Sequence, residues 1–595
     1  MWNKHQQITQ FQGEGSSHEL AALLLTECIE FSRTTLKLPT YVLYLDARSA
    51  FDVVKRELLI RHLFHLHGAN QTLLYIDNRL ASRQTVVDYD GILMGPIHDM
   101  HGLEQGGISS SDLYKIYGHE QLSLAQQSSL GIPLGNLVVS SIGQADDTAL
   151  ISNDLVFLSH LLKLSNLFCA KSLVELSAEK TRLQCYSNST RASIEADIDN
   201  LTNPIEINGT RIPFSQTASH VGIVRSTVGN AVALLDRFTA HQRSLGAVLH
   251  QGLARGHRAN PSFTLRIERM YASPVLFSGL TSLILLKNEV ESIEFHHREC
   301  LRQLLKLHKG TPRCVIFFLA GSLPATALLH MKQLGLFGMI SRKKDSLLYQ
   351  HAKNIFTYAT VAKGSWFFQI RETCLLYGLP HPLDILDNPL QKLPFNKLVK
   401  SKVVSHWESV LRDEASNLPS LLYFKPSYMS LLKVHPLWLS AGSSPMHVSK
   451  ALVQAQMLSG IYRCGALTKH WTKGYDGSCL LDTDCANTEE DIHHILSSCP
   501  ALDMTRGRLL QFTFDYSSRL PESLSSLLLS LCHPGSPQFC HFLLDCSALP
   551  SVISLAQIQG EEVLQHLFFI SRTWIFALHR ERLKRLGIWK QSGRS

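Results

Sequence analysis

The chain has 595 residues, with 57 Lys and Arg against 49 Asp and Glu and a formal net charge of +8 at pH 7. Hydrophobic residues make up 45%, which excludes a wholly disordered chain, and the length predicts about three to five domains. No apolar run reaches the roughly 20 residues that cross a bilayer, and the polar start is not a signal peptide. We therefore expect an intracellular protein, nuclear or cytoplasmic or both, that is not secreted and has no membrane partner.

The first part of the chain, to about residue 225, alternates between helical and strand patterns. Helices are predicted at residues 17–34, 54–66, 109–129 and 154–171. Strands are predicted at 41–45, 137–142, 148–151 and 181–186, with a hairpin at 84–94 around Tyr89-Asp90-Gly91. From about Gly229 onward the pattern is almost wholly helical, with breaks marked by Pro or Gly. The fold class is therefore α+β, followed by all-α modules.

Two groups of carboxylates occupy the ends of predicted strands. Asp46 follows an apolar strand, whereas Asp146 and Asp147 lie in a predicted turn between two strands, at 143–147. Adjacent carboxylates in a tight turn repel one another, and a divalent cation is the simplest compensation. With a third carboxylate they form a site for two Mg²⁺ ions of the kind used in nucleotidyl transfer. The alternative is that an Asp-Asp pair simply makes a polar turn.

The surrounding motifs favour the metal site. Five segments follow one another in order: YLDARSAFDVV (44–54), HGLEQGGISSSDLYKIY (101–117), GQADDTALIS (143–152), LSAEKT (176–181) and HVGI (220–223). In order, residue type and spacing they resemble motifs A to E of reverse transcriptases, and more narrowly those of non-LTR (LINE-type) retrotransposons. This resemblance implies a right-hand polymerase palm with partial fingers, followed by an all-α thumb and connector.

The resemblance also implies roles for single residues. Asp46, Asp146 and Asp147 would bind two catalytic Mg²⁺ ions, and Lys180 would neutralise the departing pyrophosphate. Phe51 would block a ribose 2′-hydroxyl. The incoming nucleotide and the template would approach the backbone of Gln105, Gly106 and Gly107. The primer end would be held by the turn of His220, Val221 and Gly222.

A Cys/His cluster lies near the C-terminal end, within residues 477–502. Cys479, Cys485, His494 and Cys499 are the residue types of a closed tetrahedral Zn²⁺ site. His494 is preferred over His493 because the apolar neighbours of His494 define the inward face. The order resembles the CCHC zinc segment downstream of the polymerase in non-LTR retrotransposons, although the first spacing is longer than usual. Buried free cysteines remain the alternative.

The resemblance predicts five segments. These are partial fingers and palm at 1–228, a thumb-like region at 229–330, a helical connector at 331–445, a zinc module at 446–510 and a C-terminal helical region with a basic tail at 511–595. We expect an N-terminally truncated RNA-directed DNA polymerase whose partners are an RNA template, a DNA primer or target and deoxynucleoside triphosphates. The alternative is a truncated, catalytically weak or inactive retroelement-derived protein that binds nucleic acid.

Overall fold

The computed structural model describes residues 9–11, 16–81, 83–98, 100–104, 106–107, 109–135, 137–202, 204–251, 259–358, 364–485 and 487–588. Its internal contacts divide the chain into two units. The first unit comprises Met1–Arg237, Phe277–Glu289 and Leu329–Lys400, and the second comprises Phe238–Leu276, Val290–Leu328 and Ser401–Ser595. The finer division into five segments stays a prediction.

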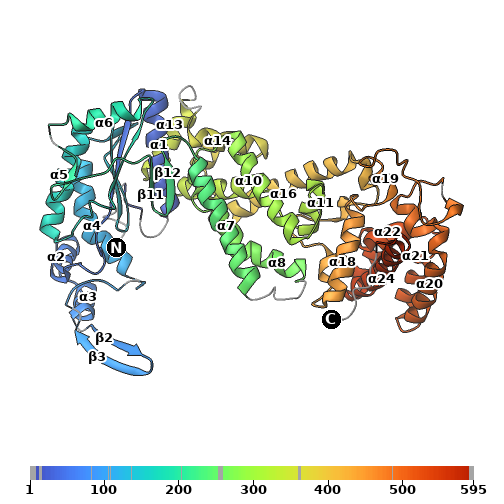
Figure 1. Ribbon diagram of the computed structural model, residues 1–595. Helices are drawn as coiled ribbons and strands as arrows, with labels where there is room; N and C mark the ends of the chain where they lie inside the picture. The colour runs from blue at the N-terminus through green and yellow to red at the C-terminus, as the bar shows by residue number, and fades with distance from the viewer. Residues whose placement is uncertain are drawn as a thin grey trace. The chain divides into compact units, whose positions relative to one another are not determined.

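The first unit contains the strands, drawn mainly in blue and cyan in Figure 1. Its strands are β1 (Thr40–Leu45), β2 (Gln84–Tyr89), β3 (Ile92–His98), β4 (Ile132–Leu134), β5 (Leu137–Val139), β6 (Ser141–Gln144), β7 (Asp147–Ser152), β8 (Arg182–Tyr186), β9 (Glu206–Ile207), β10 (Thr210–Arg211), β11 (Thr217–His220) and β12 (Ile223–Ser226). Its helices are α1 (His18–Phe31), α2 (Arg56–His67), α3 (Gln71–Ala81), α4 (Ser110–Gln127), α5 (Leu155–Ser172), α6 (Arg191–Asp199), α13 (Leu347–Thr357), α14 (Trp366–Leu376) and α15 (Pro382–Asp387). The prediction of a mixed α+β region followed by helices is therefore confirmed.

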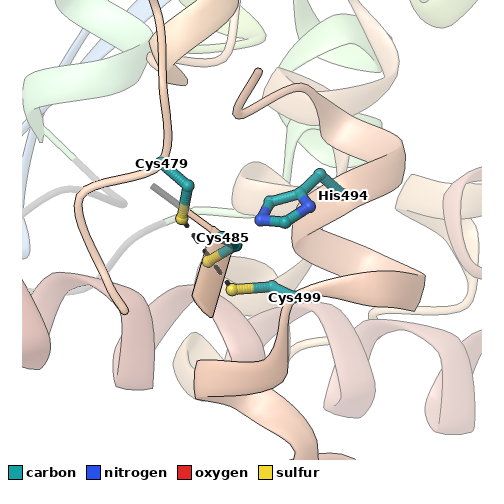
Figure 2. Close-up of side chains that lie close together, drawn as sticks. All are labelled: Cys479, Cys485, His494 and Cys499. Atoms are coloured by element: carbon teal, nitrogen blue, oxygen red, sulfur yellow. Dashed lines mark hydrogen bonds between the residues drawn. The ribbon is translucent and has the colours of Figure 1, made fainter. Parts of the chain in front are cut away.

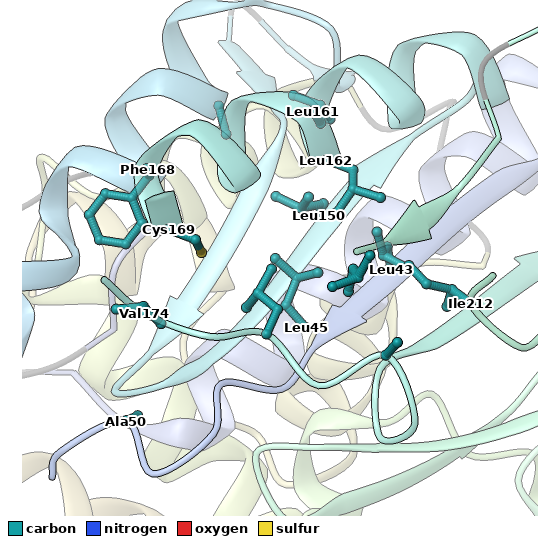
Figure 3. Packing of buried hydrophobic residues seen from close by; sticks show 14 of the residues in the cluster. Leu43, Leu45, Ala50, Leu150, Leu161, Leu162, Phe168, Cys169, Val174 and Ile212 are labelled. Atoms are coloured by element: carbon teal, nitrogen blue, oxygen red, sulfur yellow. The ribbon is translucent and has the colours of Figure 1, made fainter. Parts of the chain in front are cut away.

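A four-stranded antiparallel sheet in the order β6-β7-β1-β8 forms the centre of the first unit. Strand β1 is buried along its whole length because it has a partner on both sides. Figure 3 shows Leu43 and Leu45 of β1 with Leu150 of β7 and with Leu161 and Leu162 of α5 in one buried hydrophobic cluster. Since neighbouring residues of a strand point to opposite faces, the alternate residues of β1 face away from this cluster.

Several local predictions are confirmed by the structure. Helix α2 ends at Gly68, whose φ of 67° suits a residue without a Cβ. The β2–β3 hairpin turns at Asp90 and Gly91, which both have positive φ as a type I′ turn requires. Asp154 begins α5 because its carboxylate accepts from the backbone N–H of Val156 at 2.7 Å.

One predicted strand, at 137–142, is wrong as a single element. Residues Leu137–Val139 form β5 and pair with β4, whereas Ser141–Gln144 form β6 and pair with β7. The chain therefore changes its partner at Ser140. A continuous apolar pattern could not reveal this change, because both pieces have buried residues and a β propensity.

The second unit is helical. Its helices are α8 (Pro261–Ile267), α11 (Arg313–Ala320), α17 (Pro436–Leu439), α18 (Pro445–Leu458), α19 (Gly465–Thr468), α20 (Asp503–Ser517), α21 (Glu522–Leu531), α22 (Phe539–Asp545), α23 (Pro550–Gln559) and α24 (Glu562–Arg585). Five further helices contribute residues to both units: α7 (Ala231–Gln251), α9 (Ser273–Phe277), α10 (Lys287–Leu304), α12 (Ala325–Ser341) and α16 (Lys392–Ser416). Within the described ranges no single helix has both the length and the apolar character needed to cross a membrane, although two bent helix pairs reach them jointly.

Candidate active site and candidate metal centre

The carboxylate of Asp46 stands at the end of the central strand. The last paired residue of β1 is Leu45, which lies opposite Thr148 of β7. One step further along the same antiparallel register, Asp46 comes level with Asp147, and residues opposite each other share one face of a sheet. The backbone of Asp46 is held by the Ser177 N–H, which donates to its carbonyl oxygen at 2.8 Å. Local strand pairing therefore brings two distant motifs to one place.

The turn between β6 and β7 is tighter than the sequence predicts. Gln144 pairs with Asp147, so only Ala145 and Asp146 lie in the turn. Ala145 adopts a φ of 57°, the left-handed conformation that two-residue hairpins use. The prediction that both aspartates lie in the turn is wrong for Asp147, which is the first residue of β7. Asp147 is thereby held in the sheet register that aligns it with Asp46.

The electrostatics of this sheet end show mutual repulsion among the three carboxylates. Loss of hydration, together with the charges of Asp146 and Asp46, raises the pKa of Asp147 to about 6, and a hydrogen bond from the Val221 N–H opposes the rise. The Oδ2 atom of Asp46 is buried and accepts no hydrogen bond from the residues that the structure describes, although Lys180 Nζ lies 3.8 Å away. A carboxylate oxygen that is shielded from water and a raised acid pKa both favour binding of a cation. The residue set therefore fits Mg²⁺, which prefers oxygen ligands.

The segment predicted to bind nucleotide forms a loop before α4. Gly106 has a φ of 82° and open space where a Cβ would stand, so its backbone is accessible. At Gly107 a Cβ would lie 2.6 Å from Ser110 Oγ. Gln105, the remaining predicted residue of this loop, lies outside the described residues. The structure therefore places two of the three predicted residues in an exposed turn that leads into a helix.

Two residues that sequence reasoning missed hold this loop against motif A. Gly102 has a φ of 83°, and a Cβ there would approach the carbonyl oxygen of Asp52 to 2.8 Å. Arg56 is buried and donates to the carbonyl oxygens of Gly102 at 3.0 Å, His101 at 2.9 Å and Leu80 at 2.8 Å. The glycine was visible in the motif, but an arginine at a helix start gives no sign that it will be buried.

Phe51 of motif A packs against the helix of motif B. Its ring stacks on Tyr114 of α4, with centroids 4.7 Å apart and an interplanar angle of 28°. Its carbonyl oxygen accepts from the Leu103 N–H at 2.8 Å. The ring is therefore half-buried against Tyr114, and the backbone of Phe51 is fixed by the hydrogen bond from Leu103.

The β11–β12 hairpin covers the face of the sheet that carries Asp46. Its two-residue turn consists of Val221 and Gly222, with φ values of 49° and 75°. A β-branched residue in the left-handed region is strained, and the N–H of this Val221 donates to Asp147. His220 is buried, its ring lies 5.4 Å from Tyr44 of β1, and burial lowers its pKa to about 3, so the ring is neutral. The predicted primer-holding turn and the predicted metal ligands therefore form one site.

The second predicted site gathers three thiols and one imidazole (Figure 2). The donor atoms of Cys479, Cys485, His494 and Cys499 all lie within 4.8 Å of one another, and all four residues are buried. The sulfur atoms of Cys479 and Cys499 are 3.9 Å apart, close to the roughly 3.8 Å that two 2.3 Å Zn–S bonds span at a tetrahedral angle. His494 Nε2 is buried and makes no hydrogen bond to any described residue, whereas His493 is exposed. The chemistry and spacing of these donors fit a closed structural Zn²⁺ site.

Local backbone geometry explains the spacing of these residues. Thr488 connects Cys479 and Cys485 through two backbone hydrogen bonds. The Cys479 N–H donates to Thr488 O, and the Thr488 N–H donates to Cys485 O, both at 2.9 Å. His494 and Cys499 flank a π-helical turn, η8 (His494–Ser498), in which Cys499 N–H donates to His494 O at 2.8 Å. Burial and the neighbouring thiols raise the pKa of Cys499 to about 12, so metal binding must displace a proton.

A buried ion pair, also missed from the sequence, joins this segment to the C-terminal helix. Arg582 of α24 donates to both carboxylate oxygens of Glu490, at 2.8 and 2.7 Å, and Glu490 also accepts from the Gly465 N–H at 2.8 Å. The basic tail at the C-terminal end could contact phosphates or be a generic basic helix. The structure instead buries Arg582 and also Arg572, whose side chain donates to the carbonyl oxygen of Ser440. At least part of this charge is therefore structural.

Comparison with known proteins gives a family for the first part of the chain. Residues 5–212 match the protein family described as Reverse transcriptase (RNA-dependent DNA polymerase). No curated protein matches the chain. Reverse transcriptases use divalent metals such as Mg²⁺, in agreement with the carboxylates gathered at the end of β1. The matched segment includes Asp46, Asp146 and Asp147, whereas the β11–β12 turn follows it. Residues 5–212 therefore form a reverse transcriptase domain, an RNA-directed DNA polymerase that acts on a nucleic-acid template and primer and on deoxynucleoside triphosphates.

Proposed function

We propose that the chain is the reverse transcriptase of a non-LTR retrotransposon, which extends a DNA 3′-hydroxyl on an RNA template. The observation that carries the proposal is the alignment of Asp46 with Asp147 beside Asp146, under the β11–β12 turn. The order of the five motifs and the Cys/His segment downstream of them support the non-LTR assignment.

In this mechanism Asp46, Asp146 and Asp147 would hold two Mg²⁺ ions, and the chemistry supplied by such ions would be Lewis-acid activation of the 3′-hydroxyl and charge stabilisation of the pyrophosphate. Lys180 is exposed and 3.8 Å from Asp46, so its ammonium group can reach a phosphate near this carboxylate. Phe51, stacked on Tyr114, restricts the space beside the sugar of the incoming nucleotide. The β11–β12 turn positions the primer end against the carboxylates.

Primer extension tests the polymerase function. The full chain is given Mg²⁺, an RNA template, a DNA primer and deoxynucleoside triphosphates, and is compared with the Asp146→Asn/Asp147→Asn variant. Because the carboxylates provide several kcal/mol of charge stabilisation through the metal, extension should fall by at least about a hundredfold. Asp197→Asn, an exposed aspartate on α6, is the matched control and should retain full activity.

Equal extension by the wild type and the double variant, or none by either, would contradict the proposal. In the second case, retained binding of RNA would favour the alternative of a nucleic-acid-binding protein without catalysis. A primer at a nick in duplex DNA, compared with an annealed oligonucleotide, tests the non-LTR assignment, since elements of this class prime from nicked chromosomal DNA.

We also propose that Cys479, Cys485, His494 and Cys499 bind structural Zn²⁺.

A further inference from the structure

A second cluster of metal-binding residue types lies in the second unit, away from the Cys/His cluster in sequence. Glu268 begins a π-helical turn, η3 (Glu268–Ala272), that directly follows α8. Its carboxylate faces two histidines, His241 of α7 and His297 of α10. All three residues are fully buried. No resemblance or motif in the sequence pointed to this cluster.

The carboxylate of Glu268 lacks the partners that a buried charge requires. Neither of its oxygens accepts a hydrogen bond within the described part of the chain. The neighbouring Arg269 does not supply one, because its guanidinium donates to the carbonyl oxygens of Ala320 and Gly321. The two histidines beside Glu268 supply a counter-charge only when they are protonated. A buried carboxylate without hydrogen bonds costs several kcal/mol unless a cation compensates its charge. Compensation by a cation is therefore expected.

The distances suit a metal ion better than a direct hydrogen bond. Glu268 Oε1 lies 4.0 Å from His241 Nε2 and 3.8 Å from His297 Nδ1, beyond hydrogen-bonding range. Zn–N and Zn–O bonds are about 2.0–2.2 Å long, so two donor atoms on one tetrahedral ion lie about 3.4 Å apart. Small shifts of the two rings would bring each nitrogen within reach of an ion that also binds Glu268.

The outer surroundings of the cluster also resemble those of a metal site. The other ring nitrogen of His241, Nδ1, lies 3.0 Å from His296 Nε2. A histidine that binds a metal through one nitrogen commonly donates its other N–H to a neighbour, which fixes the tautomer and the ring orientation. The ring of His296 is itself held by stacking on Phe238, with centroids 4.3 Å apart.

We propose that Glu268, His241 and His297 bind a second divalent transition-metal ion, of which Zn²⁺ is the natural candidate. Two imidazoles and one carboxylate suit Zn²⁺, which binds N and O donors as well as sulfur. Among the described residues only the Cys/His cluster has all its donor atoms within 4.8 Å of one another. The donor atoms of His241, Glu268 and His297 are therefore more widely spaced. An ion bound by all three residues would draw the two imidazoles together and so link α7, η3 and α10.

Metal stoichiometry on the full chain tests this site. Wild type dialysed against Zn²⁺ should retain two ions per chain, and Glu268→Gln should retain one. Glu291→Gln, an exposed glutamate on the same helix as His297, is the matched control and should retain two. Cys485→Ser/Cys499→Ser should also retain one ion, and combining these changes with Glu268→Gln should remove both.

Co²⁺ as a spectroscopic probe distinguishes the sites. The Cys/His site gives intense thiolate-to-metal absorption, which the second site lacks because its donors are nitrogen and oxygen. Loss of the weaker Co²⁺ absorption in Glu268→Gln, with the thiolate bands unchanged, would support the proposal even if Cys485→Ser/Cys499→Ser fails to fold. One ion per chain in the wild type, or two in Glu268→Gln, would overturn it.

Discussion

Replacement of Glu490 by glutamine tests how the Cys/His segment is attached to the C-terminal helix. Glu490 and Arg582 are 3% and 6% exposed and make two parallel hydrogen bonds. Burial favours loss of the Arg582 proton, but the hydrogen bonds and charge of Glu490 outweigh it and raise the pKa of Arg582 above its usual value. Glu490→Gln leaves a buried guanidinium without its counter-charge, and such a loss costs about 3–5 kcal/mol.

The expected cost corresponds to a large shift in melting temperature. A folded unit of about 150–250 residues shifts by roughly 2–4 °C per kcal/mol, so the transition that includes α24 should fall by roughly 6–20 °C. The adjacent Glu489 provides a matched control, because it forms an exposed ion pair with Lys469. Exposed pairs contribute at most about 1 kcal/mol, so Glu489→Gln should shift the same transition by no more than about 4 °C.

Thermal unfolding followed by calorimetry and hydrogen exchange within α24 measure these effects. The double variant Glu490→Leu/Arg582→Met should be less destabilised than either single variant, because it removes both charges and leaves none unpaired. If Glu490→Gln and Glu489→Gln melt within about 2 °C of each other, the buried pair does not hold α24 to this segment, and the reasoning fails.

Three further predictions concern the two candidate sites. Cys485→Ser/Cys499→Ser should lose one Zn²⁺ ion per chain and melt at a lower temperature; unchanged metal content by mass spectrometry would contradict the site. Because the pKa of Asp147 is raised to about 6, its carboxylate is protonated as pH falls through 6, so primer extension should require more Mg²⁺ at about pH 5.5 than at about pH 7. A constant Mg²⁺ requirement between about pH 5.5 and about pH 7 would refute the shift. The same rise means that the folded state binds this proton more tightly than the unfolded chain, so the contribution of Asp147 to stability increases as pH falls from about 6 to 4. Phe51→Ala should increase incorporation of ribonucleotides relative to deoxynucleotides, whereas an unchanged ratio would exclude Phe51 from sugar selection.

The sequence by itself determined much of the first site, because its features are local. The apolar run that becomes β1 ends at Asp46, and the pattern of the next strands places Asp146 in the turn between them. Asp90 and Gly91 marked the turn of the β2–β3 hairpin correctly, since the conformational preference of glycine does not depend on distant contacts. The order of these local elements was enough to predict a reverse transcriptase, which the family match confirms.

Tertiary structure decided the features that depend on partners far apart in the chain. Asp147 lies in β7 because Gln144 pairs with it, and the strained turn at Val221 reaches it from a separate hairpin. Arg582 and Glu490, 92 residues apart, pair in the interior. The periodicity of apolar residues in a sequence predicts which positions are buried. A buried charged residue does not belong to such a pattern, so its burial cannot be predicted in this way.

The cluster around Glu268 shows the same limit most clearly. Its three residues come from α7, η3 and α10, and none has a spacing that indicates a metal site. Cys479, Cys485, His494 and Cys499, by contrast, lie within 21 residues, so two short turns suffice to bring them together. Sites formed by local turns can thus be predicted from sequence. Charged residues that meet only after helices pack can be identified only in the folded chain, where burial removes their hydration.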